Sequence, residues 1–264
     1  MNTKIYVDKA RKRLAHVNSH LESGYVNLDA VVDNIQQGRG NPRACAMSLS
    51  SHAQANAIVS WFEQHDLPAT RQWWYVAAKL DQMWYQMEED TQSPGAKFLQ
   101  LLKPLLSNNE ELIEWFIHYD LAYDMKRVEN HKTHDFWAYQ AIVALRGEWP
   151  RLIARCEKVL IDPPKTNSRQ KYLSDYDFYL ALAHGDKEKM QSAILELTAS
   201  KVLNGRANDE SGYTEGLIST PAVIYAKIAW RHGYQLRIDS PYIPAEWLPV
   251  EPSERYENYY DFLK

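Results

Sequence analysis

Cysteine and glycine are scarce in this chain, and each shortage excludes some classes of fold. Cys45 and Cys156 are the only cysteines among 264 residues. They could pair with each other, but two thiols make no disulfide scaffold, and a buried reduced pair is expected. Ten glycines do not suit the many tight turns of a β-sandwich, whereas 45% hydrophobic residues can fill a complete core. The composition therefore favours a helical globular protein.

Long apolar runs are also missing. The start of the chain, Met1 to Asp8, lacks the apolar stretch of a secretory signal. No window reaches the roughly 18 uninterrupted apolar residues that a membrane-spanning helix needs. The net charge of −4 argues against a general nucleic-acid binder but is compatible with a local acidic face for a basic partner. We expect a cytoplasmic protein that contacts neither membranes nor nucleic acid.

Signatures of catalysis are missing as well. There is no Gly-x-Ser-x-Gly turn and no glycine-rich phosphate loop. His16 and His20 have a metal-binding spacing, but the helical pattern turns both toward solvent and no third ligand is near in sequence. His131, His134 and Asp135 could bind a metal, yet they serve equally well as helix caps and surface residues. We therefore assign no catalytic, cofactor-binding or metal-binding residue.

The chain is rich in apolar residues at helical spacing, many of them among its 9 tryptophans and 17 tyrosines. The helix expected at residues 69–88 is apolar on nearly all sides, which predicts a central position. The expected helices are residues 8–23, 28–37, 52–64, 69–88, 93–106 with an end or kink at Pro104, a helix capped by Asn108 or Asn109, 134–146, 150–160, 172–184, 186–201 and 221–232.

Two of the expected helix pairs turn at a glycine, Gly147 in one and Gly185 in the other. Aligning these glycines pairs Ala-Leu-Arg-Gly-Glu with Leu-Ala-His-Gly-Asp, a weak repeat of the kind found in arrays of helix pairs. We predict an all-α fold of antiparallel helical hairpins packed as a single array. One domain, residues 1–264, is expected, with a short extended segment at its C-terminal end.

The segment from Gly216 to Pro244 contains sequence signals for both the start and the end of a helix. Thr220 is a good N-cap and Pro221 suits the first helical position. Gly233 can take the left-handed conformation that ends a helix. Alternating residues at 235–239 then predict a short strand or an extended packing segment. Prolines at 241, 244, 249 and 252 exclude a long helix beyond it.

This segment and the hairpin before it resemble the immunity protein 49 family of bacterial polymorphic-toxin systems. The similarity is strongest over about residues 134–248. It is carried by Tyr176-Asp-Phe-Tyr-Leu-Ala-Leu-Ala-His-Gly-Asp186, by Pro221-Ala-Val-Ile-Tyr-Ala-Lys-Ile-Ala-Trp-Arg-His-Gly-Tyr234 and by Ile238-Asp-Ser-Pro-Tyr-Ile-Pro244. After Leu197 the chain departs from the family, because Ser200-Lys-Val-Leu-Asn replaces a His-Lys-x-Tyr-Trp-like run. The resemblance implies an all-α protein that binds and neutralises a cognate toxin without catalysis.

We therefore predict an immunity protein that forms a stable complex with a toxin, a nuclease, and blocks its active site or its substrate path. An acidic surface would mimic the nucleic-acid backbone toward a cationic cleft. The predicted partner-binding residues are Glu88, Glu89, Asp90, Asp209, Glu210 and Glu215. A helical-repeat adaptor for another protein is the alternative, and a metal-dependent hydrolase using His131, His134 and Asp135 is a further one.

Overall fold

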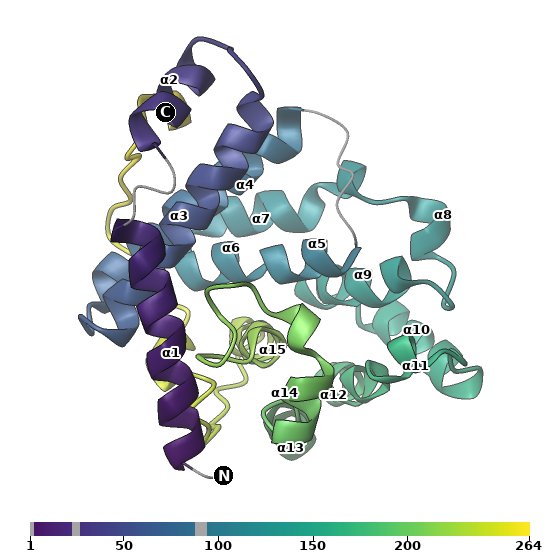
Figure 1. Ribbon diagram of the computed structural model, residues 1–264. Helices are drawn as coiled ribbons and strands as arrows, with labels where there is room; N and C mark the ends of the chain where they lie inside the picture. Colours follow the sequence, from purple (N-terminus) through teal and green to yellow (C-terminus); the bar gives the residue numbers. More distant parts are fainter. Residues whose placement is uncertain (1–2, 23–26, 88–93) are drawn as a thin grey trace.

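The computed structural model describes residues 3–22, 27–87 and 94–264, and over these ranges it contains helices and no strands (Figure 1). The predicted all-α fold is confirmed. The first helices are α1 (Thr3–Glu22), α2 (Leu28–Gln36), α3 (Pro42–Phe62), α4 (Leu67–Met87), α5 (Pro94–Gln100), α6 (Leu102–Ser107) and α7 (Glu110–His118). Then follow η1 (Asp120–Ala122), α8 (Met125–Val128), α9 (His134–Leu145), α10 (Trp149–Ile161), α11 (Asn167–Gln170) and α12 (Leu173–His184). The last are α13 (Lys187–Glu196), α14 (Ser200–Gly205), η2 (Ala207–Asp209), α15 (Thr220–Arg231), η3 (Ala245–Trp247) and η4 (Asp261–Leu263).

The first half of the chain is built on the long α3–α4 hairpin. The central position predicted for α4 is confirmed, because Trp74, Leu80 and Trp84 are buried and α3, α6 and α7 pack against it. Helix α3 begins at Pro42, ten residues before the predicted start. The side chain of Asn41 accepts the Ala44 N–H at 3.0 Å, and Pro42 fits the first helical position, so the helix starts there.

The predicted break near Pro104 is present, but it lies three residues earlier. Helix α5 ends at Gln100 and α6 begins at Leu102. Proline has no N–H to donate to the carbonyl four residues back, and its ring crowds that carbonyl. The disruption therefore appears before the proline. Asn108 ends α6 with a left-handed φ of 55°, while Asn109 caps α7, so the two asparagines divide the roles left open by the sequence.

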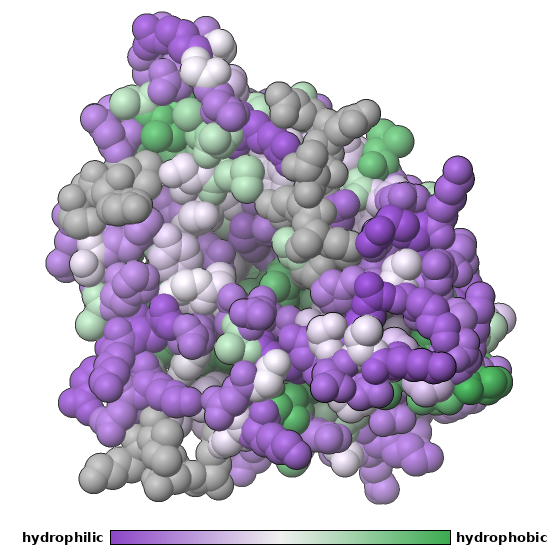
Figure 2. All heavy atoms as spheres, turned by 45° about the vertical axis from the view of Figure 1, so that its right-hand side comes forward, coloured by the Kyte–Doolittle hydropathy of each residue, from purple (hydrophilic) through white to green (hydrophobic). Residues whose placement is uncertain are grey.

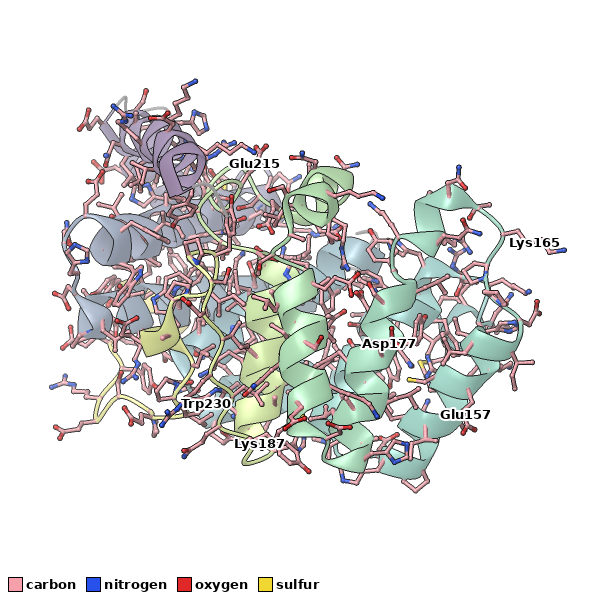
Figure 3. The ribbon with its side chains drawn as sticks, turned by 90° about the horizontal axis from the view of Figure 1, so that it is seen from below. Glu157, Lys165, Asp177, Lys187, Glu215 and Trp230 are labelled. Carbon is pink, nitrogen blue, oxygen red and sulfur yellow. The ribbon has the colours of Figure 1, made fainter. Side chains whose placement is uncertain are left out.

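The second half of the chain is an array in which α10, α12, α13 and α15 pack in that order (Figure 3). Gly147 and Gly185 turn the two predicted hairpins with φ values of 67° and 71°. Helix α13 ends at Glu196, five residues earlier than predicted. A turn follows in which the Thr198 hydroxyl donates to the Leu195 carbonyl at 2.8 Å, and α14 then starts as a separate helix.

The C-terminal tail crosses the molecule without joining a sheet. Leu236 and Ile238 are buried in extended chain, so the predicted packing segment is confirmed in its non-strand form. The ammonium group of Lys227 on α15 is buried and donates to the carbonyls of Leu248 (3.2 Å) and Pro249 (3.1 Å) and to the side chain of Asn108 (2.5 Å). A buried lysine thus fastens the tail to α15.

A continuous set of buried apolar residues runs from Val17 in α1 to Leu263 near the C-terminus. Cys156 lies within it, Cys45 is half-buried, and both thiols are free. Among the described residues, no helix has the length and apolar character required to cross a membrane.

Candidate partner-binding surfaces

The carboxylate of Asp209 faces inward. Only 5% of the residue is exposed, and its oxygens accept from the Arg206 guanidinium at 2.7 Å and the Tyr172 hydroxyl at 2.8 Å. Arg206 in turn donates two hydrogen bonds to Asp175, at 2.6 and 3.1 Å. The exposure expected for Asp209 from its polar surroundings in sequence is therefore wrong, because a buried arginine draws it into the core. The predicted partner-binding role remains a prediction.

Asp175 is the centre of this buried cluster. Besides Arg206, it accepts the indole N–H of Trp137 at 2.7 Å and the hydroxyl of Tyr225 at 2.8 Å. These donors come from α9, α15 and the segment after α14, so a single carboxylate on α12 joins four parts of the second half of the chain. A buried charge is tolerated only when its oxygens are satisfied in this way. The cluster fixes the positions of these helices relative to one another, and the helices in turn exclude it from solvent.

Glu210 is directed at the start of α15. Its carboxylate accepts the Thr220 N–H at 2.7 Å and the Thr220 hydroxyl at 2.5 Å. Thr220, the predicted N-cap, is thus the first helical residue, and a side chain from the preceding loop satisfies its N–H. Burial raises the pKa of Glu210 to about 7. Its predicted contact with a partner would compete with this capping role.

Glu215 is exposed at the edge of a cavity between α1 and α14 (Figure 3). Its carboxylate forms an ion pair with Arg13, whose guanidinium also donates to the carbonyls of Gly212 at 2.7 Å and Glu215 at 3.0 Å. Of the predicted residues within the described ranges, Glu215 is the one whose carboxylate lies at the surface. Glu88, Glu89 and Asp90 lie outside the described residues, and their role stays a prediction.

A groove between α12 and α13 is the strongest candidate that the sequence prediction missed. Its volume is about 460 Å³. It is lined by the acidic residues Asp177, Asp186 and Glu196, by the apolar residues Leu180, Ala181 and Ala193, and by His184, Lys189 and Ser192. An acidic rim over an apolar floor fits a basic segment that carries some apolar side chains.

Helical spacing separates two neighbouring carboxylates of α12. Residues two positions apart on a helix point about 200° from each other, so Asp175 faces the core while Asp177 lines the groove. Glu157 on α10 extends the acidic surface next to Asp177 (Figure 3). Burial raises the pKa of the Cys156 thiol to about 12, and the nearby carboxylates of Glu157 and Asp177 add to this rise.

The residues considered as metal ligands have separate partners. His131 contacts Asp162 at 3.1 Å through Nε2, Asp135 pairs with Arg127, and the His134 ring stacks on Trp137. His16 is exposed as expected, whereas His20, expected to face solvent, contacts the hydroxyl of Tyr213 at 2.9 Å. Within the described part of the chain, no three histidine, cysteine or acidic side chains converge to form a metal site.

Residues 137–247 match the model of the family described as Immunity protein 49, in agreement with the region of strongest resemblance. No curated protein and no solved structure matches the chain. This part of the chain is therefore similar to immunity proteins of that family. The α12–α13 groove and Glu215 lie within the matched residues.

Proposed function

We propose that this chain neutralises a nuclease toxin and that its α12–α13 groove covers the cationic substrate-binding surface of that nuclease. The proposal starts from the match of residues 137–247 to the immunity protein 49 family. The two proteins form a stable complex in which the toxin cannot reach nucleic acid. The observation that carries the proposal is the acidic groove itself. Carboxylates of the groove pair with the same cationic residues of the nuclease that otherwise bind the phosphates of nucleic acid.

The charge of the groove is available to a partner. Lys189 forms an ion pair with Asp186 at 3.0 Å. Within the described ranges, Asp177 and Glu196 have no cationic side chain at ion-pair distance, and both are exposed. Lys and Arg side chains of a toxin would supply the missing partners. Close charge pairs across such an interface can each contribute several kcal/mol to binding, on the order of 1.5–7.

One face of the molecule lacks a broad apolar surface that could serve as an alternative interface. Figure 2 shows a face dominated by hydrophilic residues, with hydrophobic ones in small separate patches. Broad apolar patches usually mark interfaces that depend on hydrophobic burial. Here the expected complex forms rapidly at low salt and more slowly as salt rises, because exposed charges steer the encounter.

The acidic residues predicted from sequence enter the proposal in two ways. Glu215 and the segment Glu88-Glu89-Asp90 are proposed as further contacts with the toxin. Asp209 and Glu210 are proposed to act indirectly, because they hold the loop that carries Glu215. Alanine replacement of Glu215 should weaken the complex without reducing thermal stability by more than the loss of one exposed ion pair, about 0.5 kcal/mol.

The direct test is co-expression with the product of the neighbouring gene. The wild-type chain should restore growth and co-elute with the toxin in size-exclusion chromatography. The triple variant Glu157→Lys, Asp177→Lys and Glu196→Lys should bind at least about a hundredfold more weakly and fail to restore growth, because it places like charges against the toxin.

A matched control keeps the same change in net charge. The variant Glu246→Lys, Glu254→Lys and Glu257→Lys alters exposed carboxylates of the C-terminal tail, away from the groove. It should restore growth as the wild type does. Equal binding by the two triple variants would disprove the groove as the interface. A bound toxin without activity on DNA or RNA would disprove the nuclease assignment but leave the interface standing.

A further inference from the structure

The cavity beside Glu215 shares no lining residue with the α12–α13 groove. It has a volume of about 380 Å³ and lies between α1, α14 and the loop before α15. Its lining combines basic residues of α1 with apolar, polar and acidic residues of α14, the loop before α15 and the C-terminal tail. A cavity of this size is within the range of small-molecule sites.

Helix α1 is fixed against the loop, so the cavity has a defined wall. Arg13 donates to two loop carbonyls and pairs with Glu215, and the Tyr6 hydroxyl donates to the Leu217 carbonyl at 3.3 Å. The backbone of Gly216 approaches α1 closely: a Cβ atom there would lie 3.4 Å from the Cβ of Lys9. Glycine at this position, with φ of 80°, allows the helix to rest on the loop.

One wall of the cavity is cationic. Lys9, Lys12 and His16 follow one another at helical spacing along a single face of α1 and cover about 10 Å of helix length. Over the residues that the structure describes, neither lysine has a carboxylate within ion-pair distance. The two acidic groups in the lining are engaged elsewhere, since Glu215 pairs with Arg13 and Glu210 caps α15.

The opposite wall is partly apolar. Leu203, Ala207 and Ile218 lie in it beside Asn204, Glu210 and Glu215, and the buried Tyr242 closes it from the tail side. The Tyr242 ring is held edge-on by Tyr6 at 5.0 Å between ring centroids. A ligand with an anionic end and a flat or apolar body would satisfy both walls together. An inorganic ion would use only one of them.

We infer that this cavity binds a phosphate monoester with an aromatic or apolar organic group, of which a nucleoside monophosphate is the nearest simple example. The phosphate lies against Lys9 and Lys12, where two neighbouring ammonium groups match a dianion better than a single carboxylate. The organic part lies against Leu203, Ile218 and Tyr242. The inference does not rest on the identity of the toxin.

Calorimetric titration of the purified chain with AMP tests the site. AMP should bind saturably, and both inorganic phosphate and adenosine should bind at least tenfold more weakly, because each uses only one wall. A 5′-phosphorylated dinucleotide tests whether the phosphate monoester that binds here is a free nucleotide or the 5′ end of a nucleic acid. Binding as tight as that of AMP identifies the end of a nucleic acid, and weaker binding identifies a free nucleotide.

Variants then locate the binding. Lys9→Gln and Lys12→Gln should each weaken AMP binding about five- to tenfold, and Ala207→Trp should abolish it by filling the cavity. The control Lys158→Gln with Lys187→Gln changes exposed lysines of α10 and α13 and should bind AMP normally. Thermal melting shows whether each variant is folded. The inference is overturned if AMP does not bind the wild type at millimolar concentration, or if folded cavity variants bind it as tightly as the control.

Discussion

Arg206 donates two hydrogen bonds to Asp175 across 31 positions of sequence, at 2.6 and 3.1 Å, in a site from which water is almost excluded. The same carboxylate also accepts from Trp137 and Tyr225, so its loss would leave the buried indole N–H and phenol O–H without this acceptor, and Arg206 with Asp209 as its remaining carboxylate partner.

Asp175→Ala should therefore reduce the free energy of unfolding by about 3 kcal/mol or more, the usual cost of breaking a buried ion pair from one side. Urea denaturation measures this loss. Asp177→Ala is the matched control, two residues along the same helix, and should change stability by less than about 0.5 kcal/mol while weakening toxin binding. Equal destabilisation by the two changes would contradict the buried role of Asp175.

Glu210 predicts a pH dependence of stability. Burial raises its pKa to about 7 in the folded protein, above the ordinary glutamate value of 4.5. The folded state therefore holds a proton that the unfolded state has released, and the contribution of Glu210 to stability falls as pH rises from about 4.5 to about 7. The slope should reach about 1 kcal/mol per pH unit.

Glu210→Gln should remove this slope, because the amide oxygen can still accept the Thr220 N–H. The test is the difference in unfolding free energy between wild type and variant at a series of pH values, which cancels the histidines common to both. The exposed Glu254→Gln serves as control and should give a flat difference. A flat difference for Glu210→Gln as well would show that Glu210 ionises normally.

Gly185 is required by its backbone conformation. Its φ is 71°, and a Cβ atom there would lie 2.9 Å from the Tyr234 hydroxyl oxygen. Gly185→Ala should cost about 1 to 2 kcal/mol. Gly205→Ala, at the end of α14 with nothing within 4 Å of the added Cβ, should be neutral or slightly stabilising. Thermal melting of the two variants should rank them in that order, and the opposite order would refute the turn geometry.

The two cysteines should differ in reactivity. Burial raises the pKa of Cys156 to about 12, so its thiol is neither exposed nor ionised at neutral pH, whereas Cys45 is half-buried. A thiol reagent should modify one cysteine in the native protein and two in denaturant. Cys45→Ser should abolish the native reaction. Persistence of that reaction in the variant would show that the Cys156 site opens readily.

Local signals in the sequence predicted most helix ends. Asn27, Asn109 and Asp186 cap helices through their own side chains, and Gly147 and Gly185 end them with positive φ. Such signals act over three or four residues and can be read directly. The sequence did not predict the first ten residues of α3. Residues 42–51 carry small side chains at the positions where an amphipathic helix normally shows large apolar ones.

The candidate site was less predictable, because charge along the sequence does not show which side of a helix a carboxylate takes. Asp209 was predicted at the surface and is buried by Arg206, a residue three positions away. Asp175 and Asp177 have the same acidic character in sequence, yet one lies in the core and the other in the groove. Only the neighbours supplied by distant helices separate these cases.

The tail held by Lys227 has a consequence for the order of folding. Leu263 is part of the buried apolar set, and the carbonyls that satisfy Lys227 come from residues 248 and 249. These contacts join residues of wide sequence separation, whose pairing costs loop-closure entropy before it adds stability. The tail should therefore become ordered in a late step of folding, after the helices that it covers have packed together.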